Sequence, residues 1–362
     1  PGPTVWGQPG AATWRSAGRG KSWAHDCARF SNVIEGKPGY ILLVMLEHTP
    51  SAEGGRSGLT IGFDIGGTNL RAAVIDPAGE IVDSMSVPTA VEARELEDDI
   101  VRCVDSLAAS HDIDAVGLAL AGFLDPECEI VRFAPHLPWR DAPVREILSK
   151  RLDVPVRLEH DANSAAWGEW RFGAGRGAKE WVFCAIGTGI GATLFNDGTI
   201  YRGAFGTAPE FGHLVVSPGG RQCSCGKRGC LERYASGTAL PDTCADLRGD
   251  FETTLPENPS GEEITAAARR GDPLGLAVMD NFGQWLGQGL SMVADVLDPE
   301  LIVIGGGVSK DADLFLDRAR EAMASQIVGA GHRPLARVAT AKLGSAAGMI
   351  GVADLARQEH RG

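Results

Sequence analysis

The feature that most constrains the fold is a strand, glycine turn and strand pattern that occurs twice. The first copy, "LTIGFDIGGTNLRAAVID" (residues 59–76), alternates apolar residues on both sides of Gly66 and Gly67. The second copy, "WVFCAIGTGIGATLFNDG" (residues 181–198), begins about 120 residues later and turns at 187–191. The repetition predicts a duplicated chain in which each half carries its own glycine turn.

Size and charge narrow the class of protein. The chain has 362 residues, 44% hydrophobic and 22% charged, which suits two domains with separate cores. Its 47 acidic and 34 basic residues give a net charge of -13, which disfavours nucleic acid and anionic membrane surfaces as partners. The apolar run at 40–46 is shorter than the roughly 20 residues of a membrane span, and no secretory signal is evident. We therefore expect a cytoplasmic protein whose cysteines are ligands or buried thiols.

Residues 1–57 differ from the remainder. They carry scattered Trp, Pro, Gly and Arg without an apolar period, which predicts a disordered N-terminal extension. Met45 followed by a polar stretch resembles an ordinary protein start, so the upstream part is a candidate mis-called start. The alternative is a DNA-binding helix pair, but Gly and Pro interrupt each possible helix.

Glycine turns can hold phosphate groups. A glycine lets the backbone approach a phosphate closely and direct N–H groups at it. A third cluster follows the buried-type strand of "LIVIGGGVSKDADLFLDRARE" and opens onto an amphipathic helix. Two alternatives are a purely steric need for glycine in hairpins and a dinucleotide-binding motif, although the latter must open a helix. The candidate nucleotide-binding residues are Asp64, Gly66, Gly67, Thr68, Gly187, Thr188, Gly189, Gly305, Gly306 and Gly307.

Two aspartates suit phosphoryl transfer. Asp161 lies where a strand at 154–158 passes into a helix, a position from which a carboxylate can accept the proton of a substrate hydroxyl. It could equally be only a helix cap. Asp64, beside the first glycine turn, could hold Mg²⁺ through water or merely stabilise the turn. Glycine turns, a Mg²⁺-binding carboxylate and a base near the acceptor together favour a kinase.

The segment "HLVVSPGGRQCSCGKRGC" (residues 213–230) collects metal ligands. His213, Cys223, Cys225 and Cys230 match a tetrahedral Cys₃His zinc site with no position left for water, so the zinc would be structural. Free thiols or a disulfide are the alternatives.

Two glutamates flank this segment. Glu210 precedes His213 by three residues and Glu232 follows Cys230 by two, so a metal would fix both carboxylates. Paired carboxylates suit the vicinal hydroxyls of a sugar, and the free nitrogen of His213 could face another hydroxyl. Solvated surface glutamates are the alternative.

Several stretches together resemble the ROK family of repressors, open reading frames and kinases, and within it the actinobacterial glucokinases. The matching stretches from residue 59 to about residue 357 are "DIGGTNLRAAVID", "LALAGFLD", "VRFAPHLPW", "HDANSAAWGE", "IGTGIGA", "PEFGHLVV", "CSCGKRGCLE", "IVIGGGV" and "LGSAAGMIGVADLA". The resemblance implies an actin-like, hexokinase-type α/β fold of two lobes. We expect a small lobe at 58–158, a large lobe at 159–344 and a helix at 345–358 that returns to the small lobe.

The resemblance also implies roles. Asp161 would be the catalytic base, the glycine turns would hold ATP with Mg²⁺, and the chain would transfer phosphate to the 6-hydroxyl of glucose. We expect a homodimer or homotetramer with glucose and ATP as its small-molecule partners. The sugar would contact His160, Asp161, Glu210, His213 and Glu232.

Some positions depart from the family pattern. His160 stands where many members have Asn, His136 replaces the Asn of "PNLPW", and Asn69 replaces a Lys. Another hexose or an N-acetylhexosamine therefore stays open as substrate, and polyphosphate stays open as donor. A sugar-responsive ROK transcriptional regulator is the rival class, but residues 1–57 show no helix-turn-helix pattern.

Overall fold

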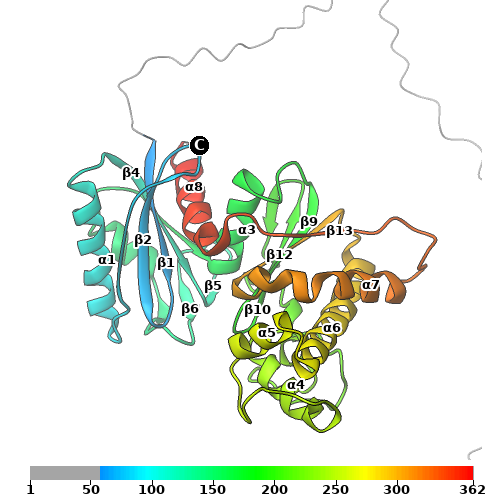
Figure 1. Cartoon of the computed structure of the whole chain (residues 1–362). Coiled ribbons are helices and arrows are strands. Elements are labelled where there is room, and N and C mark those ends of the chain that lie inside the picture. Colours follow the sequence, from blue (N-terminus) through cyan, green and yellow to red (C-terminus); the bar gives the residue numbers. More distant parts are fainter. Residues whose placement is uncertain (1–57, 362) are drawn as a thin grey trace, which may run out of the picture. The chain divides into compact units, whose positions relative to one another are not determined.

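The structure, a computed structural model, describes residues 58–361. The prediction of a disordered extension over residues 1–57 lies outside the described residues. The described part contains two five-stranded sheets and one three-stranded sheet, with helices packed against them (Figure 1).

The first sheet has the strand order β3-β2-β1-β4-β8. Its hairpin strands β1, β2 and β3 pair antiparallel, and β1, β4 and β8 pair parallel. The turn between β1 and β2 is the first predicted glycine turn. The strands are β1 (Leu59–Ile65), β2 (Asn69–Ile75), β3 (Ile81–Pro88), β4 (Ile113–Leu120) and β8 (Val156–His160).

The second sheet repeats this topology. Its order is β11-β10-β9-β12-β13, in which β9, β10 and β11 pair antiparallel and β9, β12 and β13 pair parallel. The duplicated α/β fold predicted from the two glycine turns is confirmed. The strands are β9 (Glu180–Ile186), β10 (Ile190–Asn196), β11 (Thr199–Tyr201), β12 (Leu301–Gly305) and β13 (Arg337–Thr340).

The remaining elements complete the two halves. The small antiparallel sheet consists of β5 (Phe123–Leu124), β6 (Val131–Phe133) and β7 (Arg140–Ala142). The α-helices are α1 (Ala93–Ala108), α2 (Val144–Ser149), α3 (Asp161–Phe172), α4 (Ala239–Leu247), α5 (Gly261–Arg269), α6 (Pro273–Leu297), α7 (Leu316–Gln326) and α8 (Ala347–Arg361). The 3₁₀ helices are η1 (Phe211–His213), η2 (Leu231–Arg233), η3 (Arg248–Asp250), η4 (Gly307–Leu314) and η5 (Gly344–Ala346). Among these helices none combines the length and apolar character that a membrane span requires.

The last helix, α8, packs on the first sheet and on α3 (Figure 1). Glycines permit this contact, because a Cβ on Gly62 would lie 2.0 Å from the Met349 carbonyl oxygen and one on Gly117 would lie 2.3 Å from that of Val352. Arg357 is buried and donates hydrogen bonds to the carbonyl oxygens of Gly58 and Ile75. The helix predicted at 345–358 is therefore present, with its start two residues later and its end three residues later.

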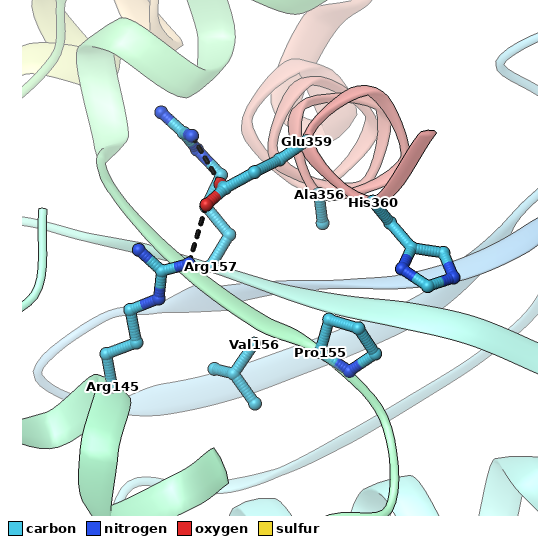
Figure 2. A pocket seen from close by; sticks show the side chains of 7 residues that line it. All are labelled: Arg145, Pro155, Val156, Arg157, Ala356, Glu359 and His360. Carbon is cyan, nitrogen blue, oxygen red and sulfur yellow. Dashed lines mark hydrogen bonds and ion pairs between the residues drawn. The ribbon is translucent and has the colours of Figure 1, made fainter. Parts of the chain in front are cut away.

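The end of α8 also binds the strand that leads to the candidate catalytic turn. Glu359 accepts hydrogen bonds from Arg145 on α2 and from Arg157 on β8, each over 2.6 Å (Figure 2). A cavity of about 210 Å³ lies beside this ion-pair cluster. One carboxylate thus joins α8 to α2 and β8, which lie more than 200 residues earlier in the sequence.

Two predicted boundaries shift. The strand predicted at 154–158 runs instead from Val156 to His160, because its pairing with β4 continues to Leu120 and His160. After the third glycine cluster, η4 precedes the amphipathic helix α7. The proposed division between lobes at residue 158 stays a prediction.

Candidate active site

The junction of β8 and α3 presents the candidate base. Asp161 is the first residue of α3 and His160 is its N-cap. The Ala162 N–H donates to Asp161 Oδ1 over 2.7 Å and to His160 Nδ1 over 3.3 Å. Asp161 is 46% exposed, and Oδ2 has no hydrogen-bond partner within residues 58–361. Its two oxygens therefore allow capping by one and proton acceptance by the other.

Asp64 lies near the end of β1, one residue before the last residue of the strand. Arg71 of β2 forms an ion pair with it. Burial raises the pKa of Asp64, the Arg71 charge opposes that rise, and the nearby Asp161 charge adds to it. The structure thus brings the candidate Mg²⁺ carboxylate and the candidate base into one electrostatic neighbourhood.

The first glycine turn is held by Thr89. Its hydroxyl donates to the Gly66 carbonyl over 2.7 Å, and its N–H donates to the Thr68 carbonyl over 3.0 Å. A Cβ on Gly67 would lie 2.7 Å from the Cβ of His136, so that departure from the family pattern contacts this turn. Gly67 and Thr68 are exposed and available to a ligand.

The second glycine turn binds Glu232. The carboxylate Oε2 accepts from the Ile190 N–H over 2.9 Å, and a Cβ on Gly189 would lie 2.3 Å from that oxygen. The turn is closed by Gly237, whose N–H donates to the Gly187 carbonyl over 2.8 Å. A side chain at position 189 would therefore displace the Glu232 carboxylate from this contact.

A cavity of about 490 Å³ joins the second and third glycine clusters. Gly187 and Thr188 line one part, and Gly307 lines another. Gly305 and Gly306 contribute differently, since added Cβ atoms would meet Phe183 at 2.5 Å and the Ile186 carbonyl oxygen at 2.4 Å. Of the third cluster, only Gly307 faces this cavity, and the first glycine turn does not line it.

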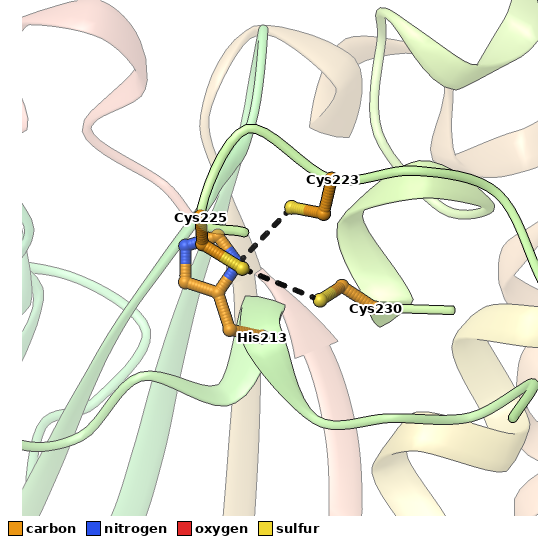
Figure 3. Close-up of side chains that lie close together, drawn as sticks. All are labelled: His213, Cys223, Cys225 and Cys230. Atoms are coloured by element: carbon orange, nitrogen blue, oxygen red, sulfur yellow. Dashed lines mark hydrogen bonds between the residues drawn. The ribbon is translucent and has the colours of Figure 1, made fainter. Parts of the chain in front are cut away.

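The predicted metal ligands converge (Figure 3). One ligand atom from each of His213, Cys223, Cys225 and Cys230 lies within 4.8 Å of the others. The His213 Nδ1 to Cys223 Sγ and Cys225 Sγ to Cys230 Sγ distances are both 3.6 Å. A disulfide needs sulfur atoms about 2.05 Å apart, so these cysteines are unbonded. Bonds of about 2.0–2.3 Å to a tetrahedral zinc place ligand atoms about 3.5–3.8 Å apart, which the two 3.6 Å distances match.

The candidate sugar-binding groups lie near one another. His213 Nε2, the ring nitrogen that faces away from the cysteines, is 3.8 Å from Glu210 Oε2. Burial raises the pKa of Glu210, the nearby imidazoles of His213 and His160 oppose the rise, and the Glu232 carboxylate adds to it. The structure therefore brings all four groups together, and His160 connects them to Asp161.

Several residues of this region were not predicted from the sequence. Thr238, Ser260 and Lys310 line the 490 Å³ cavity, and Thr238 donates to the Thr188 carbonyl over 2.8 Å. The Ser260-x-x-Glu263 capping box was a readable signal for a helix start at this place. Glu159, buried beside the catalytic turn, carried no such local signal.

Comparisons with known proteins give a consistent result. The ROK family profile matches residues 60–359. A protein named glucokinase from Streptomyces coelicolor is 39% identical over 312 residues, which are 83% of this chain and 98% of that protein. The crystal structure of a ROK family glucokinase from Streptomyces griseus in complex with glucose and AMPPNP is 40% identical with a TM-score of 0.73, covering 83% of this chain and 100% of that one.

A regulator has the same fold. A ROK family transcriptional regulator, a homologue of the E. coli MLC protein, is 26% identical with a TM-score of 0.76, covering 84% of this chain and 79% of its own. The backbone fold alone therefore does not distinguish kinases from transcriptional regulators, and the distinction must come from the side chains of the site.

Proposed function

The chain belongs to the ROK family, and we propose that it is a glucokinase that transfers the γ-phosphoryl group of ATP to the 6-hydroxyl of D-glucose. One observation carries the proposal. Asp161 presents a carboxylate oxygen without a partner in the described chain, next to His160, which is within electrostatic reach of Glu210. A proton acceptor and groups suited to sugar hydroxyls thus share one site.

The roles of the side chains follow from their chemistry. Asp161 accepts the proton of the 6-hydroxyl while that oxygen bonds to the γ-phosphorus and the bond from phosphorus to the ADP oxygen breaks. Glu210 and Glu232 accept hydrogen bonds from vicinal hydroxyls, and His213 Nε2 and His160 offer further polar contacts. Together these side chains form the proposed sugar-binding set.

The donor site is proposed to be the 490 Å³ cavity. Leu240 and Val308 supply apolar wall suited to a nucleoside, whereas Thr188 and the neighbouring glycines offer N–H groups to phosphates. This lining favours ATP over polyphosphate. A bound Mg²⁺ would neutralise phosphate charge, and Asp64 is its candidate protein ligand.

We propose a structural zinc ion at His213, Cys223, Cys225 and Cys230. The one nitrogen and three sulfur donors fit tetrahedral zinc, and no fifth group of the segment is needed. Coordination through Nδ1 leaves the Nε2 proton of His213 for a hydrogen bond on the Glu210 side.

The setting and assembly are also proposals. All seven cysteines in the described part of the chain are free, which agrees with a reducing cytoplasmic setting. We propose a homodimer or homotetramer without nucleic acid or membrane partners.

The test is a coupled assay over glucose, mannose, glucosamine and N-acetylhexosamines, with ATP or polyphosphate as donor. We expect the highest kcat/KM for glucose with ATP. Asp161→Asn should lower kcat by about 10²–10⁴-fold, because the amide cannot accept the proton, while glucose binding measured by calorimetry changes little. The control is Asp272→Asn, which alters another aspartate at a helix start and should keep kcat.

A regulator is the second candidate, supported by the comparable fold similarity to a ROK regulator. It would bind sugar without turnover. Glucose binding with no phosphorylation of any sugar in the panel would favour it and contradict the kinase.

A further inference from the structure

Glu159 is a buried carboxylate directly before the candidate catalytic turn. It is the fourth residue of β8, its side chain is 1% exposed, and it precedes His160 and Asp161. A buried charge is costly unless it is paired and hydrogen-bonded. The hydrogen-bond and ion-pair partners of Glu159 therefore indicate which segments its carboxylate connects.

Each oxygen of Glu159 accepts hydrogen bonds from two nitrogen donors, and Oε1 also accepts from the Cys128 thiol, whose sulfur lies 3.9 Å away. Oε1 accepts from the His160 N–H over 3.1 Å and from Asn163 Nδ2 over 3.0 Å. Oε2 accepts from Arg157 Nη2 over 3.1 Å and from Arg202. Burial acts to raise the pKa of Glu159, but the Arg202 and Arg157 charges outweigh it and lower that pKa, so the group is ionised at neutral pH.

The Oε1 side holds the turn that carries the base. His160 is the N-cap of α3, and Asn163 lies in the first turn of that helix with Asp161. Asn163 is itself fixed, because its Oδ1 accepts from Thr193 Oγ1 on β10 over 3.0 Å. The chain is thus held at His160, directly before Asp161, and at Asn163, two residues after it.

The Oε2 side holds the segment that leads to Glu210. Arg202 follows β11, and its carbonyl oxygen accepts from the Ala208 N–H over 3.1 Å, two residues before Glu210. Arg157 in turn donates to Glu359 of α8 (Figure 2). One carboxylate therefore links the first sheet, the segment after the second sheet's edge strand and the last helix.

We propose that Glu159 is a positioning residue for the phosphoryl transfer, whose carboxylate holds the Asp161 turn in register with the 202–210 segment. The inference rests on the proposed function, because the reaction is what makes this register matter. Catalysis by proximity is sensitive to small displacements, and an error of about 1 Å can cost roughly 10²-fold in rate. A carboxylate that only supports folding would affect stability and leave the rate of folded enzyme unchanged.

The test compares Glu159→Gln with wild type. The amide has one acceptor oxygen, so either the two arginines or the two N–H groups of the catalytic turn lose their acceptor. We expect kcat for glucose to fall about 10- to 100-fold, with a smaller rise in the KM for glucose. Glu97→Gln is the matched control, since Glu97 is also buried and bonded to Trp139 and Arg151, but it belongs to α1.

A second variant covers a failure of Glu159→Gln to fold. Arg202→Gln removes one partner at a side chain that is 21% exposed and leaves Glu159 bonded to Arg157 and the turn. We expect mainly a rise in the KM for glucose of about tenfold, because the segment before Glu210 is released. In the double variant the losses in kcat/KM should be less than multiplicative, since both act through one contact.

The outcomes separate two hypotheses. A wild type without sugar kinase activity contradicts the proposed function and removes the premise of the inference. An active wild type for which Glu159→Gln keeps kcat, or for which Glu97→Gln loses as much, overturns the inference alone. The positioning role is likewise overturned if Arg202→Gln leaves the KM for glucose unchanged.

Discussion

Gly306 and Gly307 are adjacent residues with different structural demands. Gly306 has φ of +79°, and a Cβ there would lie 2.4 Å from the Ile186 carbonyl oxygen, whereas a Cβ on Gly307 meets nothing within 4 Å. We expect Gly306→Ala to lower the free energy of unfolding by about 1–3 kcal/mol or more, through strain and the clash with β9. Gly307→Ala should change it by less than about 1 kcal/mol and instead raise the KM for ATP. Denaturant unfolding and steady-state kinetics check the pair, and equal destabilisation by both would refute the assignment.

At the scale of single residues, local motifs were predictable and distant partners were not. The glycine clusters, Asp161 and the four metal ligands could be proposed from the sequence because their residue types and spacing suit the chemistry, and the structure brings the four ligands together. Glu159 could not, because its partner Arg202 is 43 positions away. The different roles of Gly306 and Gly307 likewise depend on β9, which lies more than a hundred residues earlier.

The long helix α6 begins at a capping aspartate whose contribution should depend on pH. Asp272 accepts from the Gly275 N–H over 3.0 Å and from the Thr254 N–H over 2.8 Å. Burial acts to raise the pKa of Asp272, but these hydrogen bonds, with those from the threonine hydroxyls, lower it to about 2. The unfolded value is about 3.9. The stabilisation is therefore fully present above about pH 5 and is lost as the pH falls towards 2.

Asp272→Ala tests this helix start. We expect it to cost about 0.5–2 kcal/mol at pH 7, as the loss of an N-cap does. The difference from wild type should shrink as the pH falls from 5 to 2, because protonation removes the same contribution from the wild type. Thermal unfolding across that range is the measurement. A difference that stays constant would mean that the charge of Asp272 contributes nothing to the cap.

At the scale of elements, the existence of strands and helices followed from apolar periodicity, and their contacts did not. The start of α8 moved because η5 occupies Gly344–Ala346, and its end moved because Glu359, one residue beyond the predicted end, accepts hydrogen bonds from Arg145 and Arg157. Gly62 and Gly117 have no side chain, which lets the α8 backbone pack closely on them. In the sequence alone they look like glycines that merely weaken a strand. The reason for these glycines is the packing of α8, which comes from the far end of the chain.

At the scale of the whole molecule, the duplication was readable because each half repeats one hairpin with one glycine turn. The sequence did not reveal how the halves are joined. Buried polar links do this work, such as Asp354 of α8, which accepts from Trp167 and Arg171 of α3, each over 2.9 Å. Such links join residues almost 190 positions apart and leave no local pattern.

The zinc content of the whole protein tests the proposed metal site in the segment at residues 213–230. We expect about one zinc ion per chain, held with an apparent free energy on the order of 10 kcal/mol. Cys225→Ser should lower the zinc content and raise the KM for glucose, because the candidate sugar glutamates, Glu210 and Glu232, lie within three residues of the ligands His213 and Cys230. Metal analysis and kinetics on the same preparation are the measurements. Cys103→Ser, a buried thiol on α1, is the control and should keep zinc. Zinc-free protein with an unchanged KM would contradict the link.

The return of α8 sets an order of events during synthesis. The carbonyl oxygen of Ile75 accepts a hydrogen bond from the guanidinium of Arg357, which is synthesised 282 residues later. Until then, the strands around Gly62 and Gly117 emerge with the surface for α8 uncovered. The first sheet has all of its strands by residue 160, yet the helix that covers it is made only after β13, the last strand of the second sheet. Translation that stops before residue 347 would leave the oldest part of the protein exposed to chaperones and proteases, although every one of its own strands had been made.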